Sequence, residues 1–91
     1  MNNYSLNDYA DALGQCLRPE WRPLVDAPTL ELLAKAAPPG QARGMVPQAR
    51  LAAERQKLAN MVGQLPSTEI AQREAEINAL EDQMRSRGWL S

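Results

Sequence analysis

The sequence predicts an all-α fold, a small helical domain in which two short N-terminal helices precede a C-terminal antiparallel helical hairpin. Apolar residues recur at spacings of three, four and seven along most of the chain, which is the periodicity of one helix face. No stretch shows the alternation of apolar and polar residues that is typical of a strand. Prolines and glycines separate the periodic stretches, and we interpret residues 1–91 as a single helical domain.

The first helix is predicted at residues 5–17. Ser5 is a good N-cap, and Asp8, three positions on, can complete a short form of the capping box. Gly14 lies in the helix interior, where glycine is unfavourable, and therefore suggests close packing against a neighbouring element. Pro19 disfavours helical geometry at the residue before it and ends the helix.

The rest of the N-terminal half is predicted from its prolines. Residues 18–25 hold two prolines and are expected to be irregular. A second short helix is predicted at residues 26–37, with Asp26 as its N-cap. Residues 38–47 are rich in proline and glycine, and we interpret them as a mobile linker between the N-terminal helices, residues 1–37, and the hairpin.

The hairpin at residues 48–88 takes up almost half of the chain. Each of its helices carries apolar residues seven positions apart, a spacing that keeps them on one seam. The seam residues are Leu51, Leu58, Met61, Val62 and Leu65 in the first helix, predicted at residues 48–65, and Ile70, Ile77, Leu80 and Met84 in the second, predicted at residues 68–87. Two helices alone cannot bury such a seam, so we expect other apolar surface to cover it.

Local signals place the ends of the hairpin helices. Pro66 ends the first helix because it lacks an N–H, and Ser67 or Thr68 can cap the second. Gly88 is expected to end the second helix in a left-handed conformation, which brings Trp89 back toward the last turn as in a Schellman motif.

Charged residues interrupt the seam of the predicted hairpin. Arg55 is expected to reach Glu74 or Glu81 on the other helix. In the favoured interpretation these residues lie at the seam edge, with aliphatic stems packed and charged groups in water. The alternative is a semi-buried ion pair that fixes the register of the hairpin.

Composition excludes most catalytic and metal-binding chemistry. The chain has no histidine and one cysteine, Cys16, so it lacks the commonest general base and any set of Cys and His ligands for zinc. No stretch matches a phosphate-binding loop. We therefore predict no catalytic residues, no metal ligands, no cofactor and no enzyme activity.

The sequence also bears on location. Residues 1–5 lack the basic and apolar regions of a signal peptide, and no apolar run is long enough for a membrane span. One cysteine cannot form an internal disulfide, which fits a reducing compartment. We expect a cytoplasmic protein without membrane contact and, because the chain opens on methionine, a complete small gene product.

The candidate partner-binding residues are an aromatic residue and several arginines. Trp21, Arg18 and Arg22 are residue types enriched at binding hot spots, and the neighbouring prolines fix their backbone. Arg43 and Arg50 are predicted as secondary charged contacts. The competing interpretation is that Trp21 fills a gap between helices as a core residue.

The favoured hypothesis is a non-catalytic protein-binding module, an adaptor or inhibitor that occupies a surface of a larger protein partner. Under this hypothesis we also expect the protein to be encoded by a phage or mobile element. The chain contains no phenylalanine, and such a thin core adds a homodimer to the expected assemblies.

The alternative is a nucleic-acid-associated regulatory protein. Residues 35–63 carry a net charge of +4, between flanking segments of −3 and −2, and the basic region runs from Lys35 to Lys57. The net charge of the chain is only −1, whereas general nucleic-acid binders carry a strongly basic face. Nucleic acid is therefore the less favoured partner.

Overall fold

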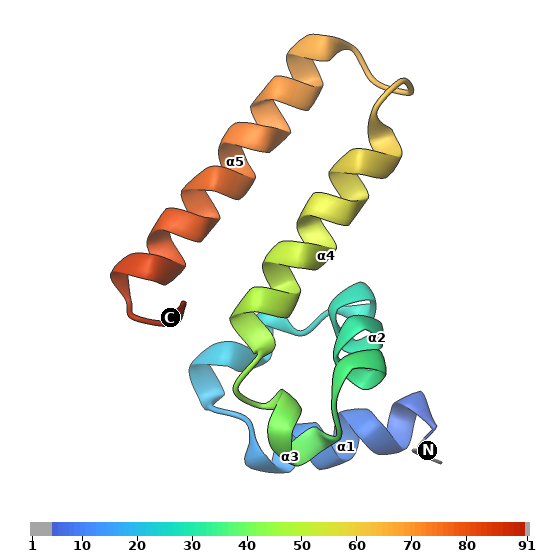
Figure 1. Ribbon diagram of the computed structural model, residues 1–91, viewed down its shortest axis with the longest axis vertical. Helices are drawn as coiled ribbons and strands as arrows, with labels where there is room; N and C mark the ends of the chain where they lie inside the picture. Colours follow the sequence, from blue (N-terminus) through green and yellow to red (C-terminus); the bar gives the residue numbers. More distant parts are fainter. Residues whose placement is uncertain (1–4, 91) are drawn as a thin grey trace. The chain divides into compact units, whose positions relative to one another are not determined.

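A computed structural model describes residues 5–90, and residues 1–4 and 91 lie outside this range. The prediction that the N-terminal segment is not a signal peptide therefore concerns residues that lie mostly outside the described part. The elements are α1 (Leu6–Cys16), the 3-10 helix η1 (Pro19–Leu24), α2 (Ala27–Ala36), α3 (Pro39–Ala42), α4 (Val46–Met61) and α5 (Ser67–Ser86), shown in Figure 1. Within the described part, the β structure is limited to an isolated bridge between Val62 and Leu65. The predicted all-α fold is confirmed.

Contacts within the chain group into two units, Met1–Arg50 and Leu51–Ser91. The first unit, unit 1, holds α1, η1, α2, α3 and the beginning of α4. The second, unit 2, holds the rest of α4 and all of α5. The closely packed helix pairs are those that α1, α2 and α3 form with one another in unit 1.

The helices of unit 1 begin where the capping residues predict. Ser5 Oγ accepts a hydrogen bond from the amide of Asp8 at 3.1 Å, and Asp26 Oδ1 accepts one from the amide of Thr29 at 3.0 Å. Each bond satisfies an amide of a first helical turn, which has no partner within its own helix. The chain leaves α1 at Leu17 in an extended conformation, two residues before Pro19.

Two segments of unit 1 are more regular than predicted. Residues 18–25 contain the 3-10 helix η1, closed by hydrogen bonds such as Trp21 N–H to the Arg18 carbonyl at 3.0 Å. Two prolines are compatible with this short helix because their fixed φ is close to its helical value. The prediction of an irregular segment is therefore wrong.

The interpretation of residues 38–47 as a mobile linker is also wrong. They contain α3, which packs against α1 and α2, and the Pro39 and Ala42 side chains are buried. Pro39 occupies the first turn of α3, where a missing N–H costs no helical hydrogen bond. The same proline that follows one helix therefore begins the next.

The core of unit 1 is made of buried side chains from every one of its elements. They are Tyr9, Leu13, Leu17, Trp21, Thr29, Leu33, Ala37, Pro39, Ala42, Val46 and Pro47. The hydroxyl of Tyr9 donates a hydrogen bond of 2.7 Å to the Ala37 carbonyl, which joins α1 to the end of α2. Gly14 has no role in close packing, because a Cβ at this position would meet nothing within 4 Å.

In unit 2 the turn between α4 and α5 begins earlier than predicted. Helix α4 starts at Val46 and ends at Met61, four residues before Leu65, and Gly63 follows with φ of +90°. Glycine adopts this left-handed conformation without steric cost, so the helix stops before it reaches Pro66. Pro66 itself takes the N-cap position of α5, and neither Ser67 nor Thr68 caps that helix.

The other end of α5 is a Schellman motif, as predicted. Gly88 has φ of +75°, the Trp89 amide donates to the Met84 carbonyl at 2.9 Å, and the Gly88 amide donates to the Arg85 carbonyl at 3.0 Å. Both bonds satisfy carbonyls that the end of the helix would leave without partners. The guanidinium of Arg87 lies 5.1 Å from the centre of the Trp89 ring.

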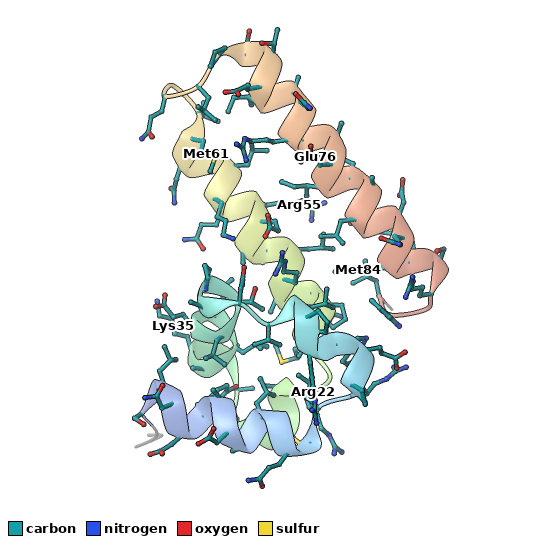
Figure 2. The ribbon with its side chains drawn as sticks, turned by 180° about the vertical axis from the view of Figure 1, so that it is seen from behind. Arg22, Lys35, Arg55, Met61, Glu76 and Met84 are labelled. Atoms are coloured by element: carbon teal, nitrogen blue, oxygen red, sulfur yellow. The ribbon has the colours of Figure 1, made fainter. Side chains whose placement is uncertain are left out.

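Helices α4 and α5 run antiparallel (Figure 1), and an ion pair joins them across the hairpin. Arg55, labelled in Figure 2, points from α4 toward α5, and its Nη2 lies 2.8 Å from Glu81 Oε1. Arg85 contacts the other oxygen of Glu81 at 3.1 Å. The Arg55 side chain is 49% exposed, which agrees with the seam-edge interpretation rather than a semi-buried pair. The partner is Glu81, and Glu74 is exposed.

Burial along the seam is uneven. Leu51, Ile77 and Met84, which lie away from the turn, are buried. Toward the turn the apolar side chains are only partly covered, and Val62 is 62% exposed. The half-buried residues there are Leu58, Met61, Leu65 and Ile70.

Candidate functional site

A pocket in unit 1 gathers three of the predicted partner-binding residues. Trp21 lies in η1, Arg18 is the N-cap residue just before it, and Arg43 follows the last residue of α3. Cys16, at the end of α1, and Gly44 complete the lining of a pocket of about 320 Å³. The pocket exists because η1 and α3, the two elements that sequence patterns missed, hold these side chains around one space.

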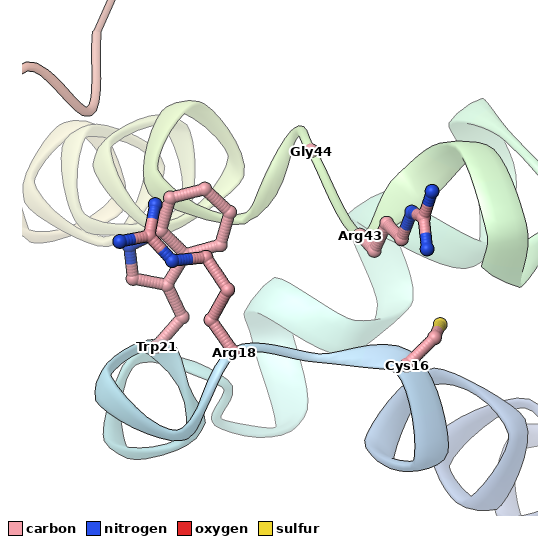
Figure 3. A pocket seen from close by; sticks show the side chains of 5 residues that line it. All are labelled: Cys16, Arg18, Trp21, Arg43 and Gly44. Carbon is pink, nitrogen blue, oxygen red and sulfur yellow. The ribbon is translucent and has the colours of Figure 1, made fainter.

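One side of the pocket is a stacked pair. The guanidinium carbon of Arg18 lies 4.6 Å from the centre of the Trp21 ring (Figure 3), and Arg18 also forms an ion pair with Glu20. A cation over an indole face is attracted by the ring quadrupole. Trp21 is only 7% exposed, so it is mainly a core residue, and Arg18 presents the accessible charge.

Arg43 and Cys16 stand on the other side of the pocket (Figure 3). The Arg43 side chain is exposed, and within residues 5–90 it has no hydrogen bond or ion pair. The Cys16 thiol lies 3.4 Å from the Leu13 carbonyl and 3.9 Å from the Pro39 carbonyl, both as acceptors. Arg43 is therefore the cation of the pocket that is available to an added anionic group.

Arg22 and Arg50 lie outside this pocket. Arg22 lines a shallower depression with Asp11 and Gln15 on α1, and its Nη2 donates to the Gly14 carbonyl at 3.4 Å. Arg50 connects α4 to the start of α2, because its Nη1 lies 3.1 Å from the Leu24 carbonyl and 3.2 Å from Asp26 Oδ2. Arg50 thus has a structural role, and only Arg18, Trp21 and Arg43 share a site.

The basic region from Lys35 to Lys57 is largely neutralised inside the chain. Three of its five basic side chains contact carboxylates: Arg50 with Asp26, Arg55 with Glu81 at 2.8 Å, and Lys57 with Glu54 at 3.4 Å. Lys35 and Arg43 have no ion pair with a residue between 5 and 90. This arrangement leaves little continuous positive charge.

Titration is perturbed at Tyr9. Burial raises the pKa of its phenol above the ordinary value of 10.0, and the electrostatic effect of the nearby Cys16 raises this pKa further. Among residues 5–90, no three His, Cys, Asp or Glu side chains are grouped to hold a metal ion. No helix in that range is long and apolar enough to cross a membrane.

No protein-family model matches this chain, and neither a curated protein nor a solved structure is significantly similar to it. The site must therefore be interpreted from its own geometry. Of its lining, Cys16 and Gly44 were not predicted as binding residues. Cys16 lies near the end of the predicted helix 5–17, and Gly44 lies in the segment 38–47 that was interpreted as a linker.

Proposed function

We propose that this chain is a non-catalytic protein-binding module that takes an acidic segment of a larger protein partner into the Arg18–Trp21–Arg43 pocket. The observation that carries the proposal is that Arg18, Arg43 and Trp21 line one space, and that Arg43 has no ion pair with any residue between 5 and 90. Arginine and tryptophan are the side chains most enriched at binding hot spots. In this proposal the protein acts in the cytoplasm as an adaptor or inhibitor, consistent with a phage or mobile-element origin.

The pocket fits a carboxylate with an apolar neighbour. Arginine binds carboxylates through two parallel N–H groups, and Arg43 has this fork exposed. The Arg18–Trp21 stack offers a flat surface against which an aliphatic stem can lie. A glutamate side chain within a peptide supplies both parts.

The test is a titration of the intact protein with two synthetic peptides, one carrying a leucine flanked by glutamates and the other the same leucine flanked by lysines. The indole N–H signals of Trp21 and Trp89 are recorded by NMR, so that Trp89 serves as an internal reference. We expect the acidic peptide alone to shift the Trp21 signal. Arg43→Gln should weaken its binding at least tenfold, about 1.4 kcal/mol, while Arg73→Gln, an exposed arginine of α5, should not.

Three outcomes would contradict the proposal. Equal binding of both peptides would remove the role of charge. Equal affinity for free glutamate or inorganic phosphate would indicate a small-molecule site. Binding of a mixed-sequence DNA duplex that weakens steeply with salt, and more tightly than either peptide, would favour the nucleic-acid alternative.

A further inference from the structure

Unit 2 leaves apolar surface uncovered on the seam of its hairpin near the turn. Leu58 and Met61 lie near the end of α4, and Val62 and Leu65 follow in the turn after it. Val62 is the most exposed of these four side chains, at 62%. Uncovered apolar patches on small proteins usually mark interaction surfaces. The patch lies at the turn end of the heptad-spaced seam of α4 and α5, so we expect its partner to be another helical surface of the same spacing.

The two helices of the hairpin carry opposite charge. Residues 51–61 of α4 carry two basic residues and one acidic residue, net +1, whereas α5 carries two basic and five acidic residues, net −3. On α5, Glu74 and Glu76 are exposed and form no ion pair with any residue between 5 and 90. Each chain therefore offers a helix segment of net positive charge, whose Arg55 and Lys57 also contact Glu81 and Glu54 of the same chain, and an acidic helix with carboxylates unpaired within that range beside the same apolar seam.

We propose that this hairpin face binds a second copy of the chain, with α4 of one copy packed antiparallel against α5 of the other. A two-fold axis along the length of the hairpin produces this pairing and brings both turns, with their uncovered apolar residues, to the same end. A two-fold axis across the hairpin would instead place α4 on α4 and α5 on α5, which opposes like charges. The first arrangement alternates basic and acidic helices around a four-helix bundle.

The ion pair across the hairpin fixes which charges meet. Side chains on a helix lean toward its N-terminus, so the contact of Arg55 with Glu81 places the Arg55 backbone level with a residue somewhat before Glu81. Lys57, two residues nearer the turn, then stands at the height of Glu74 and Glu76. Because the axis runs along the hairpin, Lys57 of one copy meets Glu74 of the other at this height, and the symmetry makes the contact twice.

This inference is independent of the proposed function, because it concerns α4 and α5 whereas the pocket is built by residues 16–44. Its first test is sedimentation equilibrium, in which we expect the mass to rise from 10.1 kDa to twice that value as concentration increases. Val62→Glu should weaken the dimer at least tenfold, and the control Asn60→Glu, at an exposed position near the end of α4 and two residues before Val62, should not.

The second test uses charge reversal. Lys57→Glu alone and Glu74→Lys alone should each weaken self-association at least tenfold, because every contact then joins like charges. An equimolar mixture of the two variants should form a heterodimer, detected by native mass spectrometry, at least tenfold more tightly than either variant pairs with itself. Mixing restores opposite charges only between chains, so this result separates the dimer from a contact within one hairpin.

The inference is wrong if the native chain stays at 10.1 kDa up to about 500 µM, a range that detects even weak association. A dimer in which the mixture shows no preference for the heterodimer would also overturn it, because α4 would then not face α5. Equal effects of Val62→Glu and Asn60→Glu would exclude the seam as the interface. Circular dichroism on each variant confirms that its helices are retained.

Discussion

Tyr9 shows how one side chain connects helices that are far apart in sequence. Its hydroxyl donates to the Ala37 carbonyl, and the ring is buried in unit 1. Tyr9→Phe keeps the ring and leaves a buried carbonyl without this donor, so we expect the free energy of unfolding at pH 7 to fall by about 1–2 kcal/mol. Urea denaturation of the two proteins measures the difference.

The raised pKa of Tyr9 adds a pH dependence with a defined sign. Above pH 10.0 the phenol of the unfolded chain loses its proton while the buried phenol keeps it, so the folded state binds more protons. The contribution of this group is complete below that pH and is lost as pH rises through the folded-state pKa. The difference in free energy of unfolding between the native protein and Tyr9→Phe should therefore become smaller above pH 10.0. A difference that stays constant with pH would contradict a pKa of Tyr9 raised by burial.

At Thr29 we expect a substitution to increase the stability of the fold. It is 0% exposed, and within the described range its hydroxyl has no hydrogen-bond partner, although its amide is bonded to Asp26. Thr29→Val has nearly the same shape and removes the buried polar group, so we expect a gain of about 1 kcal/mol in stability. Thr68→Val, at an exposed position of α5, is the matched control and should change stability by less than about 0.5 kcal/mol. A loss at Thr29 would mean that its hydroxyl is hydrogen-bonded in solution.

Among the helices, glycine acts in two different ways. Gly88 ends α5 with φ of +75°, a conformation that a Cβ disfavours, so Gly88→Ala should cost about 1–2 kcal/mol. Gly14 lies inside α1 with open space around it, so Gly14→Ala should add about 0.5–1 kcal/mol by improving helix propensity. Thermal unfolding of both variants checks the pair, and a loss at Gly14 would restore the close-packing interpretation.

For the molecule as a whole, the correction that matters most is α3. Ala42 is 0% exposed and Gln41 beside it is exposed, so this four-residue helix has a buried side and an outer side. Ala42→Asp buries an uncompensated charge and should cost about 3 kcal/mol, whereas Gln41→Asp should cost less than about 0.5 kcal/mol. If both variants melt like the native protein, α3 is not part of the core and residues 38–47 do act as a linker.

Local chemistry accounts for what the sequence determined. Capping by Ser5 and Asp26, the stop at Gly88 and the reach of Arg55 to a glutamate depend on residues within one turn or on helical periodicity. Residue types, rather than capping or periodicity, placed Arg18, Trp21 and Arg43 among the binding candidates. They could not show that these three side chains converge, because their meeting depends on η1 and α3, which carry too few residues for a periodic signal.

Tertiary structure decided the features for which a local sequence pattern is compatible with two different structures. A proline after a helix can lead into a linker or begin a new helix. Pro39 begins α3, in which Pro39 and Ala42 are buried. An arginine side chain can contact solvent, a binding partner or a group of its own chain. Arg50 contacts the Leu24 carbonyl and the Asp26 carboxylate, whereas Arg43 is exposed. Such choices depend on which groups lie nearby in space, and spacing along the chain does not contain that information.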